Sequence, residues 1–277
     1  MSLDRGFFPA PPALVEHARR FADSGGVAAT PKVAATVLLL RPAGTGFEVY
    51  MIRRHSAMVF GGVHAFVGGG VDASDSRTDL RWAGPDAAEW GLRLGLTPEA
   101  AQAVVCAAAR EVFEEAGVLL AGPTADSVVG DVSSDDWEAV RAALVQRRLH
   151  FADLLAEREL TLRSDLLLPW SRWITPEFEP RRFDTYFFAA LLPAGQRTRD
   201  VSGEADHTEW VRPEDVIARL HAAEITMLPP TLITLQQVAA AGDLDGVARA
   251  AARRQVATPL RPRLEQPADG PARFVLE

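Results

Sequence analysis

Three glutamates near the middle of the chain have the type and spacing that a divalent cation requires. Glu111, Glu114 and Glu115 lie within the segment 110–118, and residues three and four apart on a helix share a face. Carboxylates this close repel one another unless a cation lies among them, and Mg²⁺ and Mn²⁺ prefer oxygen ligands, often with substrate phosphates. The pattern indicates a metal-assisted enzyme that acts on phosphates. A solvated, glutamate-rich helix face is the alternative.

The residues on both sides of these glutamates predict the helix that positions them. Residues 98–109 are rich in alanine and begin with a proline, directly after Thr97, which is suited to cap a helix. Gly117 supplies a stop signal after the last glutamate. Arg110 precedes the first glutamate and can orient a carboxylate through its planar guanidinium.

The segment 110–118, Arg-Glu-Val-Phe-Glu-Glu-Ala-Gly-Val, resembles the second half of the Nudix box, Arg-Glu-U-x-Glu-Glu-x-Gly-U with U aliphatic. Upstream, Phe-Val-Gly-Gly at 66–69 is similar to the Phe-Pro-Gly-Gly that leads into the box. A long insert at about 73–98 separates the two halves, and neither Asp75 nor Gln102 is the glutamate of the first acidic position. We therefore expect a departure in the scaffold of the box and not in its chemistry.

The resemblance implies a hydrolase that cleaves pyrophosphate linkages with Mg²⁺ or Mn²⁺ as cofactor. Glu111, Glu114 and Glu115 are then the expected metal ligands, and a backbone carbonyl at Gly69 can complete the coordination shell because glycine lets the backbone come close. Glu111, Glu114 and the adjoining Arg110 are also expected catalytic residues.

A general base must lie within hydrogen-bond reach of the attacking water. In the family it is a glutamate of the box or an acid from a later loop, and Glu204 stands where that later acid is often found. We therefore include Glu204 among the expected catalytic residues, as a fourth ligand or as the base. A solvated loop acid is the alternative.

Further segments are similar to the peroxisomal-type coenzyme A diphosphatase branch of the family, over roughly residues 33–230. They include Trp-Ile-Thr-Pro at 173–176 and Arg-Arg-Phe-Asp-Thr at 181–185. The resemblance implies coenzyme A or acyl-coenzyme A as substrate, cleaved to 3′,5′-ADP and a phosphopantetheine. A wider coenzyme A signature is only half matched. ADP-ribose, dinucleotides and nucleotide sugars are therefore alternative substrates, and a catalytically silent ligand-sensing Nudix module is a rival from another class.

Four basic residues are candidates for contacts with substrate phosphates. Arg53, Arg54 and His64 lie on the path into the glycine segment, and Arg182 precedes a predicted strand. The alternative is that the arginines are surface charges and that His64 is bonded to the backbone.

Composition narrows the class of protein. The 277 residues are 48% hydrophobic, enough for a full core. The net charge of −8 argues against a general nucleic-acid or anionic-membrane surface, and a single cysteine, Cys106, excludes an internal disulfide framework. Without an apolar run of membrane-span length or a signal pattern, we expect a cytoplasmic protein whose partner is a small diphosphate substrate. A homo-oligomer is compatible with the sequence.

The order of the predicted strands and helices indicates one α/β domain over 1–277. We expect a Nudix-type α/β/α sandwich with a mixed sheet and helical insertions. Apolar, β-branched runs predict the core strands at 32–41, 47–53, 166–175, 183–192 and 209–211. The core spans about 32–225, with a helical insertion at about 134–160. A helical extension at 226–277 completes the chain.

Overall fold

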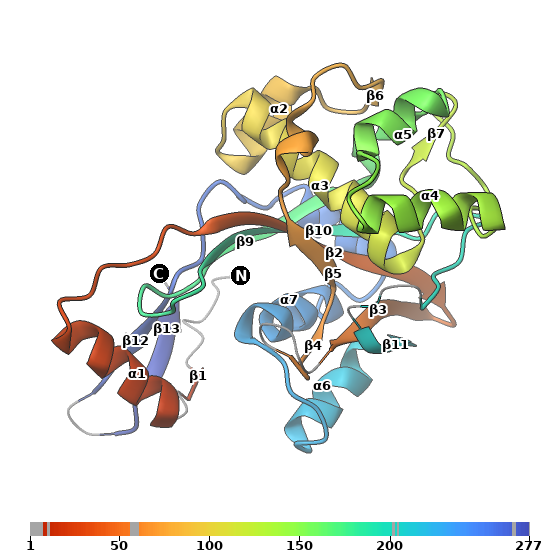
Figure 1. The fold of residues 1–277 in the computed structure, drawn as a ribbon. Helices are drawn as coiled ribbons and strands as arrows, with labels where there is room; N and C mark the ends of the chain where they lie inside the picture. The colour runs from red at the N-terminus through yellow and green to blue at the C-terminus, as the bar shows by residue number, and fades with distance from the viewer. Residues whose placement is uncertain are drawn as a thin grey trace.

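The centre of the protein is a mixed sheet, seen in a computed structural model that describes residues 8–9, 12–55, 61–200, 203, 205–267 and 270–276 (Figure 1). Its seven strands follow the order β11-β3-β2-β10-β9, with β4 beside β3 and β5 beside β2. They are β2 (Lys32–Ala43), β3 (Gly46–Arg54), β4 (His64–Ala65), β5 (Val67–Gly70), β9 (Leu168–Ile174), β10 (Phe183–Leu191) and β11 (Ala205–Val211). Each predicted core strand is confirmed; the ends of the first four shift by at most two residues, and the last strand begins four residues earlier than predicted, at Ala205.

Helix α3 (Pro98–Ala116) covers one face of this sheet and carries the three glutamates. The Thr97 side chain caps its start by accepting a hydrogen bond from Ala100 N, and Gly117 ends it in the left-handed region at φ 65°. Both boundaries agree with the sequence prediction. The alanines of the helix let it lie close to the strands, where it packs on Ala35, Val37 and Leu39.

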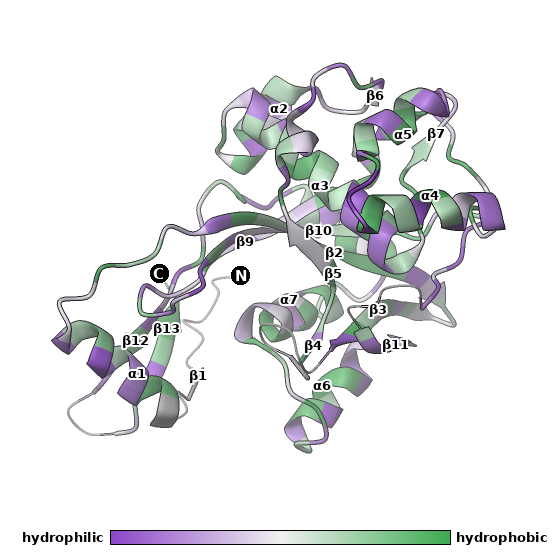
Figure 2. Cartoon of the chain, in the orientation of Figure 1, coloured by the Kyte–Doolittle hydropathy of each residue, from purple (hydrophilic) through white to green (hydrophobic). Residues whose placement is uncertain are grey.

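The insert before α3 is ordered and packed. It contains η1 (Ala73–Ser76), β6 (Trp82–Ala83) and α2 (Ala87–Leu94), and Trp90 is fully buried. Two further helices lie on the same side of the sheet, α4 (Asp135–Val145) and α5 (Phe151–Glu157). Both helices contain hydrophilic (purple) and hydrophobic (green) residues in Figure 2, as expected of helices with one face toward the core. A small sheet of order β6-β8-β7 joins these parts, with β7 (Ala121–Gly122) and β8 (Thr161–Arg163). The short helix η2 (Ser164–Leu166) follows β8.

The opposite face of the sheet is covered by α6 (Pro213–His221), α7 (Pro229–Ala239) and α8 (Leu244–Ala251). These helices pack on the alternate residues of β2 and β10, among them Leu38, Leu40 and Phe187. The sheet is therefore buried between two helical layers. The predicted α/β/α sandwich with a mixed sheet and helical insertions is the fold of the chain.

The last residues differ from the helical extension expected at 226–277. After α7 and α8, the chain forms β12 (Pro262–Glu265) and β13 (Arg273–Leu276), and β13 also pairs with β1 (Phe8–Pro9), which precedes α1 (Pro12–Asp23). The two ends of the chain thus share a sheet of order β1-β13-β12. Strands this short gain their stability from pairing with a segment distant in sequence, which no local pattern reveals.

Candidate active site

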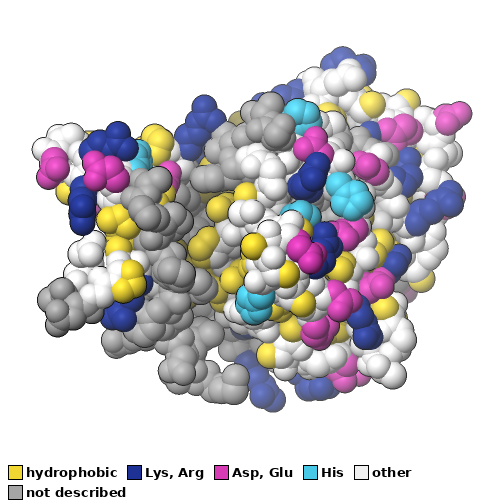
Figure 3. Space-filling model, turned by 90° about the horizontal axis from the view of Figure 1, so that it is seen from below, with side chains coloured by type: hydrophobic (Ala, Val, Ile, Leu, Met, Phe, Trp, Pro, Cys, Tyr) yellow, Lys and Arg dark blue, Asp and Glu magenta, His cyan; other side chains and the backbone are white. Residues whose placement is uncertain are grey.

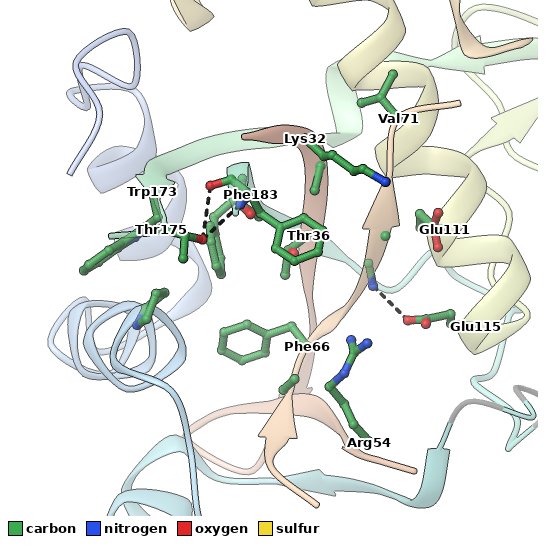
Figure 4. A pocket seen from close by; sticks show the side chains of 18 of the residues that line it. Lys32, Thr36, Arg54, Phe66, Val71, Glu111, Glu115, Trp173, Thr175 and Phe183 are labelled. Atoms are coloured by element: carbon green, nitrogen blue, oxygen red, sulfur yellow. Dashed lines mark hydrogen bonds between the residues drawn. The ribbon is translucent and has the colours of Figure 1, made fainter. Parts of the chain in front are cut away.

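A cavity of about 1020 Å³ extends from the end of α3 across the sheet to β9 (Figure 4). This volume is at the upper end of the range of small-molecule sites. One end is formed by α3 and the glycines of β5, and the other by β9, β10 and the start of α7. Hydrophobic side chains also gather in the middle of the face that Figure 3 shows.

The three glutamates of α3 all line this cavity. Glu111 and Glu115 are buried and Glu114 is partly buried. Glu115 Oε2 accepts a hydrogen bond of 2.8 Å from Gly68 N, which ties the end of α3 to β5. The structure thus brings together the carboxylates that the sequence predicted. Glu204 lies outside the described residues.

Arg110 holds these carboxylates in place. Its Nη1 donates to Glu111 Oε1 at 2.6 Å and to Glu114 Oε2 at 3.4 Å, and its Nη2 donates to Gly70 O at 2.8 Å. Burial alone would lower the pKa of Arg110, but its hydrogen bonds to Asp75 and the charges of nearby carboxylates raise it. Arg110 therefore stays a cation and offsets part of the negative charge at this end of the cavity.

Asp75 occupies the acidic position that the sequence left open. It is 1% exposed, and its two carboxylate oxygens accept hydrogen bonds of 3.0 and 2.9 Å from Arg110 Nε and Nη2. It also accepts from Asp72 N as part of the capping box of η1. The expected departure in the scaffold is therefore smaller than the sequence suggests, because the aspartate, although shorter than a glutamate, still reaches Arg110 from the first turn of the insert.

The glycines of β5 let the carboxylates approach the strand backbone. A Cβ at Gly69 would lie 2.5 Å from Glu111 Oε1, and one at Gly68, where φ is +155°, would lie 2.3 Å from Ala35 O. Carboxylates beside an open backbone have the donor chemistry that a hard cation requires. Among the described residues, however, no three acidic, histidine or cysteine side chains already converge as a metal cage. Arg110 donates hydrogen bonds to Glu111 and Glu114. An ionised carboxylate can accept about four hydrogen bonds, so these contacts do not by themselves exclude a bound cation.

Besides Arg110, the basic residues that line the cavity include Arg54 and Lys32. Arg54, a predicted phosphate contact, extends from β3 into the cavity, and its buried Nε has no hydrogen-bond partner within the described part of the chain. Lys32, at the start of β2, was not singled out from the sequence. Their charges favour an anionic group between them and the glutamates.

The other three predicted phosphate contacts do not line the cavity. Arg53 lies 3.6 Å from a carboxylate oxygen of Asp206. His64 is 6% exposed, with Nε2 3.9 Å from Glu209 Oε1, and burial is the main reason that its pKa is lowered. Arg182 donates to two backbone carbonyls. Adjacent residues of a strand point to opposite faces of the sheet, which explains why Arg53 and its neighbour diverge.

Comparison with known proteins gives consistent matches. Residues 94–238 match the family model of the NUDT19 Nudix domain. The chain is 28% identical over 235 residues to the acyl-coenzyme A diphosphatase NUDT19 of Homo sapiens, covering 72% of this chain and 62% of that protein. It is also 28% identical over 139 residues to the putative nudix hydrolase 7 of Caenorhabditis elegans, covering 50% of this chain and 45% of that one. The chain thus spans less than two thirds of these relatives.

A solved structure shares the fold. The NUDIX hydrolase from Alicyclobacillus acidocaldarius superposes with a TM-score of 0.67 at 24% identity, over 82% of this chain and 98% of that one. In the described ranges, none of the helices combines the length and the apolar character needed to span a bilayer.

Proposed function

Because its residues 94–238 match that family model, the chain belongs to the NUDT19 Nudix domain family, and we propose that it is a divalent-cation-dependent pyrophosphohydrolase acting on coenzyme A or acyl-coenzyme A. The observation that carries the proposal is that Glu111, Glu114 and Glu115 all line one cavity, which Arg54 also lines. Carboxylates for a cation and a guanidinium for a phosphate are the two requirements of such a reaction.

The glutamates and Gly69 would hold Mg²⁺ or Mn²⁺, while Arg110 keeps their carboxylates oriented. Neutralisation of phosphate oxygens and activation of the attacking water are what a divalent ion supplies at such a site. The water oxygen bonds to one phosphorus as the bridging P–O bond breaks. One of the glutamates or Glu204 accepts the proton, and the products are 3′,5′-ADP and a phosphopantetheine.

Arg54 is the phosphate contact that we retain, because its guanidinium reaches the cavity beside Glu115 (Figure 4). A planar guanidinium can donate two parallel hydrogen bonds to phosphoryl oxygens. Lys32 lines the same cavity. We add it as a second positively charged side chain that would contact the diphosphate or the additional phosphate of coenzyme A.

Two observations support a coenzyme A type substrate over smaller ones. The cavity of about 1020 Å³ continues well beyond the glutamates, and the human relative is named for acyl-coenzyme A. The presence of all three box glutamates at the cavity favours an enzyme over a silent ligand-sensing module.

A substrate panel tests the proposal. Coenzyme A, ADP-ribose, a diadenosine polyphosphate and a nucleotide sugar are incubated with Mg²⁺ or Mn²⁺, and 3′,5′-ADP and other products are separated by chromatography. We expect metal-dependent release of 3′,5′-ADP from coenzyme A, abolished by a chelator. Turnover of ADP-ribose alone would replace the substrate assignment, and tight binding without turnover of any compound would indicate the sensing module.

A further inference from the structure

The turn between α4 and α5 borders the cavity that also holds the glutamates. Arg147, Leu149 and His150 of this turn line the cavity. The proposed reaction does not use Arg147, although its side chain has a permanent positive charge. The turn belongs to the helical insertion, so its distance from the glutamates depends on how the insertion is held against α3.

A buried arginine of α4 fixes the insertion to the end of α3. Arg141 is 5% exposed, and its Nη1 donates a hydrogen bond of 2.7 Å to the backbone oxygen of Glu114. Figure 1 shows α4 beside the last turns of α3. Because the bond is made to one of the proposed metal ligands, the turn that follows α4 is kept close to the site.

Arg147 reaches from this turn to the residues that support the glutamates. Its Nη1 lies 3.4 Å from Asp72 Oδ2. Asp72 N donates to Asp75 Oδ2, which also accepts from Arg110 Nη2. Asp72 and Arg110 line the cavity as well. A short series of contacts thus connects Arg147 to the guanidinium that orients Glu111, so Arg147 lies at the same end of the cavity as the glutamates.

The ion pair between Arg147 and Asp72 is easily exchanged for another. The side chain of Arg147 is 84% exposed and that of Asp72 is 34% exposed. Exposed ion pairs contribute little to stability, because water screens the charges and two long side chains must be ordered. A phosphate group accepts two parallel hydrogen bonds from a guanidinium. An anion that enters the cavity can therefore take the place of Asp72.

The backbone at Arg147 gives no local reason for an arginine. Its φ is 56°, in the left-handed region that favours glycine after the end of a helix. Within the described ranges, Glu159 and Ala223 are the other non-glycine residues with positive φ, and neither lines the cavity. A contact between Arg147 and a ligand supplies the reason that neither the backbone nor the weak ion pair with Asp72 provides.

We infer that Arg147 is a specificity-determining residue whose guanidinium leaves Asp72 and binds a phosphate group of the substrate. The inference rests on the proposed function and deepens it, because it adds a contact from the helical insertion to those of Arg54 and Lys32. The phosphate belongs to the diphosphate or is the additional phosphate of coenzyme A. Both offer the same chemistry to a guanidinium, and kinetics distinguish them.

The kcat and KM values for coenzyme A and for dephospho-coenzyme A, which lacks the additional phosphate, test this assignment. Arg147→Gly should lower kcat/KM for coenzyme A about tenfold or more, mainly through KM, since a charge-assisted contact is lost. Arg147→Lys keeps the charge without the planar fork and should lose less, about threefold. An equal loss with dephospho-coenzyme A identifies the diphosphate as the partner, and a loss confined to coenzyme A identifies the additional phosphate.

Two matched controls separate this contact from general effects. Arg148→Ala removes the same charge at the next residue, which bonds to Gln146 and does not line the cavity. Glu159→Gly makes the same backbone change at the end of α5. Both controls should retain the wild-type kcat/KM. The melting temperatures of Arg147→Gly and Glu159→Gly should equal or exceed that of the wild type, because glycine adopts a positive φ readily.

Three results would overturn the inference. The first is a wild-type kcat/KM in Arg147→Gly. The second is an equal loss in Arg148→Ala, which would mean that only the overall charge matters. The third is a loss in Arg147→Gly that comes with a lower melting temperature, since Arg147 would then be structural.

Binding of 3′,5′-ADP separates this inference from the proposed function. The compound has one phosphate of each kind, and its affinity is measured by calorimetry with Mg²⁺ in the wild type, Arg147→Gly and Arg148→Ala. If coenzyme A is not cleaved but Arg147→Gly alone weakens this binding about tenfold, Arg147 binds phosphate and the proposed function fails. If coenzyme A is cleaved and both variants bind as the wild type does, only the inference is wrong. If neither cleavage nor binding is observed, both are wrong.

Discussion

Arg110 and Asp75 lie 35 residues apart in the sequence, yet they are joined by two hydrogen bonds of 3.0 and 2.9 Å in the interior of the protein. The pair connects the start of the insert, shortly after the glycine segment, to the helix that follows the insert. Because Arg110 also contacts Glu111 and Glu114, the position of Asp75 is transmitted to the carboxylates of the site. The insert separates the two halves of the motif in the sequence, but Arg110 still contacts Gly70 and Asp75 in the fold.

Replacement of Asp75 by asparagine should destabilise the protein. The substitution would replace one of the three carboxylate partners of the buried Arg110 guanidinium by a neutral amide, and removing a partner from a buried ion pair costs up to roughly 3–5 kcal/mol. Urea unfolding followed by fluorescence measures the difference in free energy of unfolding from the wild type.

Asp79→Asn is the control for this measurement. Asp79 pairs with Arg77 at the surface, with 64% of its side chain exposed, and exposed pairs of this kind contribute little to stability. The urea midpoint of this variant should match that of the wild type. An equal, small effect of both substitutions would show that the Asp75 pair is not the link between the two halves of the motif.

The boundaries of α3 were predictable because their causes are local. Thr97, the proline after it and Gly117 act on the helix within one turn. The core strands were predictable for a similar reason, since apolar runs bounded by turns indicate buried strands. Local patterns of this kind are sufficient to place Glu111 and its neighbours on one helix end.

The parts of the site that were not predicted depend on contacts between distant segments. Asp75 finds Arg110 only after the insert has folded away, and β12 and β13 form only beside each other and β1. His64 and Arg53 were placed near the substrate because they precede the glycines, but position along the chain does not specify the face of the sheet. For the same reason, the sequence did not reveal that Phe183 and Trp173 line the cavity.

Glu114→Gln and Glu115→Gln should each lower turnover by orders of magnitude while the fold is retained. Each removes a negative charge from the proposed cation site and keeps the shape of the side chain. A glutamine in place of Glu115 can still accept the hydrogen bond from Gly68 N through its amide oxygen. Turnover of coenzyme A and binding of Mn²⁺, followed by electron paramagnetic resonance, are measured together.

Glu99→Gln provides the control for these variants on the same helix. Glu99 lies in the first turn of α3 and is exposed, and its replacement should leave both Mn²⁺ binding and turnover at the wild-type level. Full turnover in either Glu114→Gln or Glu115→Gln would remove that residue from the set of proposed ligands.

Gly69→Ala and Gly70→Ala should differ sharply although the two residues are neighbours. A Cβ at Gly69 would lie 2.5 Å from Glu111 Oε1, so the carboxylate must move, whereas the atom nearest to a Cβ at Gly70 is Val33 O at 4.0 Å. We expect Gly69→Ala to lose about tenfold or more in kcat and Gly70→Ala to remain close to the wild type. Steady-state kinetics of both variants, with thermal melts as a check on folding, decide the matter. Equal activities would mean that the approach of Glu111 to the strand is not required.

His64 should make the protein less stable in mildly acidic solution. Burial lowers its pKa below the ordinary value of 6.5; among the surrounding charges, Glu209 opposes this change, while Arg219, Arg53 and His207 add to it. The unfolded chain therefore binds a proton that the folded protein resists, and the contribution of His64 to stability is complete above about pH 6.5 and is lost as the pH falls toward the lowered pKa. Urea unfolding at about pH 7.5 and about pH 5.5 should show a larger loss of free energy in the wild type than in His64→Gln, which cannot titrate. Identical losses in the two proteins would mean that the pKa of His64 is not lowered by folding.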